Sequence, residues 1–356
     1  MQIRRLLPLL LLITALPACG TLQYYSQSIS GQLSLMMKRE DIGELIRDDA
    51  IDEPTRHKLR RVLSIRRFAS EQLHLPDNSS YTSYADLGRP YAVWNVFAAP
   101  VLSVKPKTWC FPVAGCVPYR GYFKREDALT YAESLKAEGY DVYVGGISAY
   151  STLGWFDDPV LNTILNRPEP QLAGLLFHEL AHQKLYVKDD ATFNESFATT
   201  VELEGVRRWL AQNQHTDTFT SYQKGKQRQA QFIKLVIRTR DELEALYASN
   251  LSDDDKLKQK SQHFSSLQQR YSKLKKQWND NSYDKWFSRE LNNARIATIG
   301  TYHDHVPAFQ SMLNAANGEL ATFYANAKAL AKLDKKERDQ LLAADNKNMA
   351  RLPAQQ

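Results

Sequence analysis

His178-Glu179-Leu180-Ala181-His182 is the stretch that decides how this sequence is interpreted. On a helix, residues four apart lie on one face, so His178 and His182 can offer two imidazoles to one Zn²⁺. Glu179, on the same turn, can then act as a general base toward a metal-bound water. A chance HExxH is expected in roughly one such chain in a hundred. The surrounding sequence must therefore decide whether the pattern is a site.

The N-terminus predicts export. An apolar run over residues 6–16 follows a short basic segment. The run is too short to span a bilayer as a helix and has the length of a signal-peptide core. Pro17-Ala18-Cys19 resembles the lipobox of bacterial lipoproteins, which predicts a signal peptide over residues 1–18 and lipidation of Cys19. The alternative is an ordinary secretory signal with an incidental cysteine.

By the same resemblance, Gly20 after the cysteine favours release to the outer membrane. We therefore expect a lipid-anchored protein of the bacterial cell envelope, facing the periplasm. Several acyl chains anchor a protein stably without a transmembrane helix.

The other two cysteines agree with an oxidising compartment. Cys110 and Cys116 flank a turn that contains proline and glycine, and a disulfide between them is predicted. A metal role is disfavoured because no further cysteine and no nearby histidine is available.

Composition predicts a folded globular protein without a nucleic-acid partner. A hydrophobic content of 43% can supply a sizeable core. The net charge is +6, but no basic cluster is interleaved with aromatic residues as on nucleic-acid surfaces. Lysine-rich stretches such as 273–276 lie among helix formers and are interpreted as solvated helical faces.

Periodicity predicts an α+β fold that is predominantly helical, with a small mixed β-sheet and a long helical hairpin at about 218–290. One domain is expected over residues 19–350, and the polar segment from Asp334 onward is expected to end in a frayed tail. The expected strands are 91–99, 101–104 and 140–144.

The third metal ligand is sought downstream, where Asp190 is predicted to cap a helix that brings Glu195 opposite the histidines. Asn194-Glu195-Ser196-Phe197-Ala198 resembles the Asn-Glu-Gly-Phe-Ala segment of aminopeptidase N and other gluzincins, in which that glutamate binds zinc. The twelve residues between His182 and Glu195 are fewer than in those families. Glu202, after nineteen, fits thermolysin-like spacing but lacks the preceding asparagine. Glu195 is favoured as the third metal ligand. Glu202 is then expected either to hydrogen-bond to one of the metal-binding side chains or to bind substrate.

The whole chain resembles a bacterial family of predicted lipoprotein aminopeptidases. The resemblance implies a zincin-like core and a metallopeptidase that removes N-terminal residues. It rests on the lipobox, residues 150–156, the HELAH segment, residues 194–199, Asn292-Asn293-Ala294-Arg295, Tyr302 and Val306-Pro307-Ala308-Phe309.

Peptide hydrolysis also needs a donor to the tetrahedral oxyanion, and Tyr302 is the candidate. Its alternative is a packing role. Asn292 and Arg295 are candidates for holding the substrate backbone or terminus. His303-Asp304-His305 permits a second metal, although its two histidines need not face the same way.

Two hypotheses follow. The first is a zinc-dependent aminopeptidase that acts on peptides in the cell envelope. The second is a catalytically silent zinc-binding lipoprotein with a structural or interaction role. Two histidines and a carboxylate suit Zn²⁺, although Mn²⁺ or Co²⁺ could substitute.

Overall fold

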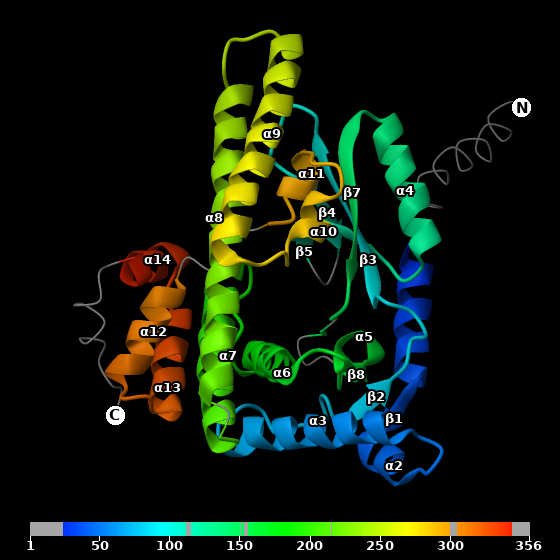
Figure 1. Ribbon diagram of the computed structural model, residues 1–356, viewed down its shortest axis with the longest axis vertical. Coiled ribbons are helices and arrows are strands. Elements are labelled where there is room, and N and C mark those ends of the chain that lie inside the picture. The colour runs from blue at the N-terminus through cyan, green and yellow to red at the C-terminus, as the bar shows by residue number, and fades with distance from the viewer. Residues whose placement is uncertain are drawn as a thin grey trace, which may run out of the picture.

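The computed structural model describes residues 24–343, except 112–114, 150, 153–155, 215 and 300–304. The described chain is a mixed α+β structure, mostly helical and with small sheets, as the sequence predicts (Figure 1). None of the described helices combines the length and the apolar character needed to cross a bilayer. The predicted signal peptide and Cys19 lie outside the described residues.

The largest hydrophobic core joins the helices around the HExxH segment. α3 begins at the N-cap Asp52, whose side chain accepts from the Thr55 amide, and buries Leu59, Val62 and Ile65 along one face. The helices that contribute to this core include α2 (Ile42–Arg47), α3 (Glu53–Glu71), α5 (Asn162–Leu165), α6 (Glu169–Lys184), α7 (Ala191–Gln212), α12 (Val306–Ala315), α13 (Leu320–Ala331) and α14 (Lys335–Ala343). The helix over 24–37 adds Leu35, and α8 (Thr216–Tyr247) adds Tyr222.

β3 (Val93–Pro100) is the centre of the main antiparallel sheet, with β6 (Arg120–Tyr122) on one side and β7 (Tyr140–Ile147) on the other. Helix α4 (Arg125–Ala137) shares a buried apolar cluster with this sheet. Two of the predicted strands are therefore present. The predicted strand at 101–104 is wrong, because the chain turns after Pro100 and the Lys107 amide returns to the Ala98 carbonyl.

Two smaller sheets complete the β-structure. The strands β1 (Arg39–Asp41), β2 (Ser83–Ala85) and β8 (Val160–Leu161) form one sheet in the order β1-β2-β8. The strands β4 (Trp109–Phe111) and β5 (Gly115–Val117) form a two-stranded ribbon in which Cys110 faces Cys116. The predicted disulfide joins these two cysteines and is confirmed.

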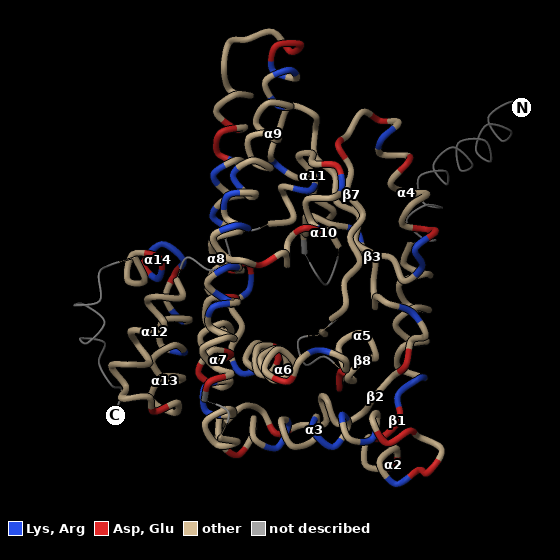
Figure 2. The backbone as a smooth tube through the Cα atoms, viewed as in Figure 1, with Lys and Arg blue, Asp and Glu red and all other residues tan. Residues whose placement is uncertain are grey.

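α8 (Thr216–Tyr247) and α9 (Asp253–Trp278) form the long hairpin that stands beside the sheet in Figure 1. The hairpin ends at Trp278, earlier than the sequence suggested, and the short helices α10 (Asp284–Phe287) and α11 (Asn293–Ile296) follow it. Its inner face forms an apolar cluster of its own. Lysine and arginine lie along both helices, and most of the acidic residues gather toward the connection between them, at 241–244 on α8 and 253–255 on α9 (Figure 2).

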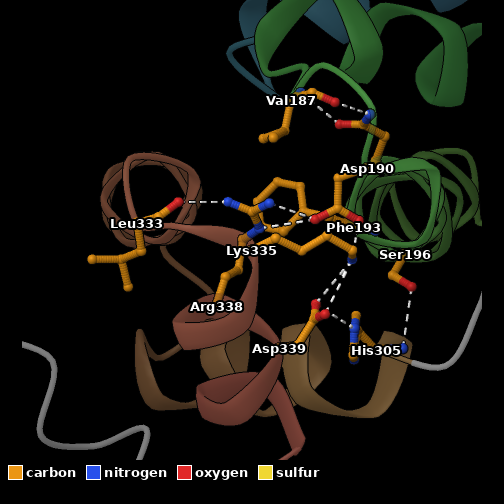
Figure 3. A network of polar contacts seen from close by, with 10 residues as sticks. Val187, Asp190, Phe193, Ser196, His305, Leu333, Lys335, Arg338 and Asp339 are labelled. Atoms are coloured by element: carbon orange, nitrogen blue, oxygen red, sulfur yellow. Dashed lines mark hydrogen bonds and ion pairs between the residues drawn. The ribbon is translucent and has the colours of Figure 1, made fainter.

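The segment after Asp334 is helical over α14, and the tail predicted at its end lies outside the described residues. Arg338 reaches back from α14 to Asp190, the N-cap of α7, with its Nη2 2.6 Å from Asp190 Oδ2 (Figure 3). Both side chains are buried. Lys335 adds a second contact to Asp190 at 3.3 Å. A buried carboxylate needs such compensation, so this segment is ordered by a residue almost 150 positions away.

Replacing Arg338 by Met should lower the free energy of unfolding by about 3–5 kcal/mol, because Asp190 is left as a buried and poorly compensated charge. Chemical denaturation measures the change. Arg47→Met is the matched control, since its ion pair with Glu44 is exposed and is expected to contribute less than about 1 kcal/mol. An equal loss in both variants would contradict the role given to Arg338.

The same pair makes a pH prediction. Burial alone would raise the pKa of Asp190, but hydrogen bonds from Arg338 and the Phe193 amide lower it below its usual value. The pair should therefore stabilise the fold fully above the unfolded aspartate pKa of about 3.9, and the contribution is lost as pH falls through the folded value. In the Asp190→Asn variant, the free energy of unfolding should depend less on pH in this acid range.

Candidate metal centre

Helix α6 presents the two histidines of the HExxH segment to α7. Pro168 is its N-cap and Pro170 lies in the first turn, where a missing amide proton costs no hydrogen bond. Leu172, Leu176 and Leu180 are buried in the main core, which fixes the rotation of the helix.

α6 and α7 form an antiparallel pair. Contacts run from His182 and Glu195 near the connection, through His178 and Glu202, to the far end. There the Trp209 indole donates to the Glu169 carboxylate at 2.8 Å. α7 therefore brings Glu195 opposite the histidines of α6, as the sequence predicts.

Asn194 holds the connection between the two helices closed. Its side-chain oxygen accepts from the Val187 amide at 2.8 Å, and its side-chain nitrogen donates to the Val187 carbonyl at 2.7 Å. Asn194 is buried, so these bonds are protected from water. Sequence reasoning noted this asparagine only as part of the Asn-Glu pattern and gave it no role. Its role is to fix the position of Glu195, the next residue.

His178, His182 and Glu195 converge on one point. Glu195 Oε2 lies 3.2 Å from His178 Nε2, and Glu195 Oε1 lies 3.5 Å from His182 Nε2. The two Nε2 atoms are 3.1 Å apart. Among the described residues, these three side chains form a group whose ligand atoms all lie within 4.8 Å, as one metal ion requires.

The carboxylate of Glu195 is the most exposed member of the group. The side chains of His178 and His182 are 16% and 6% exposed, whereas Glu195 is 35% exposed. Solvent therefore reaches the group from the side of Glu195.

Glu202 lies behind His178. Its Oε2 is 3.2 Å from His178 Nδ1, while Nε2 of the same ring faces Glu195. An imidazole that donates from Nδ1 to a carboxylate is oriented to offer Nε2 to a metal. The structure thus brings Glu195 to the ligand atoms and places Glu202 on the opposite side of the ring.

Two residues of α8 support Glu202, and sequence reasoning found neither. The Tyr222 hydroxyl donates to Glu202 Oε1 at 2.5 Å, and Lys226 Nζ lies 2.5 Å from the same oxygen. Gly174 on α6 makes room for Tyr222 and Glu202, because a Cβ there would lie 2.5 Å from the Tyr222 hydroxyl and 3.1 Å from Glu202 Oε1. No local pattern marks Tyr222 or Lys226, since their role arises only when α8 packs beside α6 and α7.

The charges of the group are mutually stabilising. Burial alone would lower the pKa of His178, but Glu195 and Glu202 outweigh burial and raise it to about 10. Burial would raise the pKa of Glu202, but His178 and Lys226 hold it at about 2. The pKa of Glu195 is also lowered, against burial, by the two histidines. A divalent cation can take the place of the proton on His178, because metal binding requires the neutral imidazole and the two ionised carboxylates balance the added positive charge.

Glu179 follows His178 on α6 and is half-buried. It lines a small cavity together with Tyr81 and Ala149. Tyr81 has a positive φ of 65°, rare for an aromatic residue, and its amide donates to the Asp158 carbonyl at 2.7 Å. Burial and the charge of Glu179 raise the pKa of the Tyr81 phenol. A neutral phenol therefore lies close to the carboxylate expected to act as base.

The segment at 150–156, which is part of the family resemblance, is described only in part, and β7 ends before it. Its described residues are tied down by the buried Asp158. That carboxylate accepts from the Thr152 amide at 2.8 Å and from the Ser151 hydroxyl at 3.2 Å.

Asn292 and Arg295 have structural contacts around α11. Asn292 caps α11 by accepting from the Arg295 amide, and its side-chain nitrogen donates to the Val142 carbonyl. Arg295 is buried, lies over the rings of Tyr143 and Trp286, and donates to the Trp286 carbonyl. Their predicted contact with substrate stays a prediction.

Tyr302 lies outside the described residues, as do His303 and Asp304. Three residues after Tyr302, the His305 amide donates to the Ser196 hydroxyl at 3.2 Å, next to Glu195 in sequence (Figure 3). The His305 ring faces Asp339 of α14 at 3.6 Å. This places His305 in the contact between α12, α14 and α7.

Comparison with known proteins identifies the family. Residues 23–342 match the model of a family described as "Putative aminopeptidase", and the chain belongs to that family. No curated protein and no solved structure gives a significant match. The match spans nearly all of the described chain, so membership does not depend on the histidine pair alone.

The position of the carboxylates predicts different outcomes for two similar substitutions. Glu195→Gln should abolish retention of zinc through dialysis, because it removes a ligand. Glu202→Gln should keep zinc but weaken its binding by about 10–100-fold, as expected when the support behind a ligand is altered. Zinc content and competition with a chelator measure both.

Glu204→Gln on the same helix is the matched control, since Glu204 is buried but pairs with Arg207 and Arg208. It should keep full zinc affinity. Full retention in Glu195→Gln together with loss in Glu202→Gln would reverse the assignment of the third ligand.

Proposed function

We propose that this protein is a zinc-dependent aminopeptidase that acts on peptides in the cell envelope. The observation that carries the proposal is the convergence of His178, His182 and Glu195 beside Glu179 in a member of an aminopeptidase family. A bound zinc ion would supply Lewis acidity, which makes water more acidic and polarises a peptide carbonyl.

Each residue of the site has a separate role in the proposed reaction. His178, His182 and Glu195 hold the ion, and Glu202 fixes the ring of His178. Glu179 accepts a proton from the attacking water and can return it to the departing amine. The exposure of Glu195 supports the approach of a peptide from that side.

Glu179→Gln separates binding from chemistry. The amide cannot accept the proton, so kcat should fall by about 10²–10⁴, while zinc content and thermal stability stay close to those of the parent. Release of free amine from a peptide library reports turnover. Unchanged turnover would exclude Glu179 as the base, and no hydrolysis by the parent protein would favour the silent zinc-binding alternative.

The requirement for a free N-terminal amine is tested with matched peptides whose N-terminus is either free or acetylated. Cleavage should require the free amine and should stop on chelation, with recovery when Zn²⁺ is restored. Cleavage of acetylated peptides alone would contradict the aminopeptidase assignment while leaving the metallopeptidase assignment intact.

We further propose Tyr302 as the donor to the oxyanion. The neighbouring contact of His305 with Ser196 supports this, because it ties the chain three residues later to the ligand helix. Tyr302→Phe should lower kcat by about 10²-fold or more, as for loss of one oxyanion donor, with zinc content unchanged. Steady-state kinetics and metal analysis measure the two effects, and an unchanged kcat would remove Tyr302 from the mechanism.

We propose an envelope location with a lipid anchor at Cys19. The disulfide between Cys110 and Cys116 supports an oxidising compartment. Mass spectrometry of the mature N-terminus tests the anchor, since acylation adds a characteristic mass to the peptide that begins with Cys19.

A further inference from the structure

The helix over residues 24–37 has two contrasting faces. Gln27, Gly31 and Leu35 face the body of the protein. Leu35 is buried, Gln27 bonds to the backbone of β6 and to Phe123, and a Cβ at Gly31 would overlap the Phe123 ring. This face fixes the helix against the sheet.

The opposite face carries an apolar stripe. Ile29, Leu33 and Met37 are 60%, 55% and 84% exposed, and their spacing of four places them on one side of the helix. They are three of the nine large hydrophobic side chains that the described chain exposes. Single exposed apolar residues are ordinary, but a row of them on one helix marks an interaction surface.

The stripe lies in a stretch without charge. Residues 20–37 contain no Asp, Glu, Lys or Arg, although these make up 24% of the chain. The polar residues on the exposed face are serines, namely Ser26, Ser30 and Ser34. A helix with bulky apolar residues on one side and uncharged small polar residues beside them suits the boundary between headgroups and acyl chains.

We propose that Ile29, Leu33 and Met37 insert shallowly into a lipid bilayer, so that the helix over 24–37 lies flat on the membrane. The chain outside the described structure supports this occupant, because the apolar run at 6–16 and Cys19 come directly before the helix. From Cys19 to Tyr24 the chain can span at most about 18 Å. A tether at Cys19 therefore holds the stripe within reach of the surface.

A second copy of the chain is the other possible occupant. Three side chains offer far less area than the roughly 800 Å² per partner of a stable interface. A bilayer needs no minimum area once the chain is tethered to it, because the tether removes most of the cost of association.

A cavity beside the helix adjoins this surface, because Ser30 and Ser34 of the exposed face line it, whereas Ile29, Leu33 and Met37 do not. It measures about 280 Å³ and is lined by Gln27, Gly31 and Leu35 of the inward face, together with Lys38, Arg89 and Lys124. The proposal therefore rests on apolar contact alone and predicts little dependence on salt.

Fluorescence quenching on the full-length mature protein in liposomes tests the proposal. The other described cysteines are joined in a disulfide, so Leu33→Cys supplies a site for a thiol-reactive bimane. Leu257→Cys on α9 is the matched control, because Leu257 is also an exposed helical leucine. Lipids with a spin label on the acyl chain should quench the label at position 33 at least twofold more than the label at 257.

Adding Ile29→Asp and Met37→Asp to the Leu33→Cys protein should abolish that difference, while the protein stays bound to the liposomes and its Tm stays unchanged. Equal quenching at both positions, or quenching that survives the aspartates, would overturn the proposal. The proposal would also be overturned if the protein had a doubled molecular mass in lipid-free solution and the label at position 33 were shielded there, since a second copy would then cover the stripe.

Discussion

The close approach of α6 to α7 is the constraint on which the metal centre depends. Gly205 on α7 permits it, because a Cβ there would lie 2.6 Å from the Phe177 ring of α6. Gly174 permits the corresponding approach on α6, where Glu202 and Tyr222 lie close to the backbone. At larger separation the carboxylate of Glu195 would not reach both imidazoles. Small residues at these two positions therefore determine the geometry of the ligand atoms.

Buried charge then determines which other elements must be present. Glu202 is almost fully buried, and an isolated carboxylate in that position would lose its hydration without compensation. Lys226 and His178 provide opposite charge, and Tyr222 provides a hydrogen bond. Because Lys226 and Tyr222 belong to α8, the long hairpin is part of the support of the metal centre. The α7 N-cap shows the same principle, since Asp190 requires Arg338 of α14.

The sequence predicted what local patterns encode. The His pair, the cap at Asp190 and the disulfide all arise from residues near one another in the chain, and the structure contains them. A local pattern also gave a wrong prediction, the strand at 101–104. Its β-branched residues follow a proline at which the chain turns. The contacts of Lys226 and Arg338 could not be predicted. Each lies on a helix whose pattern indicates only an exposed charge, and packing of distant segments gives it a buried partner.

The spacing that made Glu195 doubtful has a simple geometric explanation. In an antiparallel pair, residues near the connection face one another across a short loop, so a ligand near the end of α6 and one near the start of α7 need few residues between them. His182 and Glu195 meet this condition. Glu202 lies seven residues further along α7, about 10.5 Å at 1.5 Å per residue, whereas His178 lies only four residues back along α6. Glu202 therefore lies beyond the point where the two Nε2 atoms meet, and its carboxylate contacts Nδ1 of His178 instead. One helix thus supplies both the carboxylate at the ligand atoms and the carboxylate that orients a ligand, because a spacing of seven residues returns to the same face two turns later.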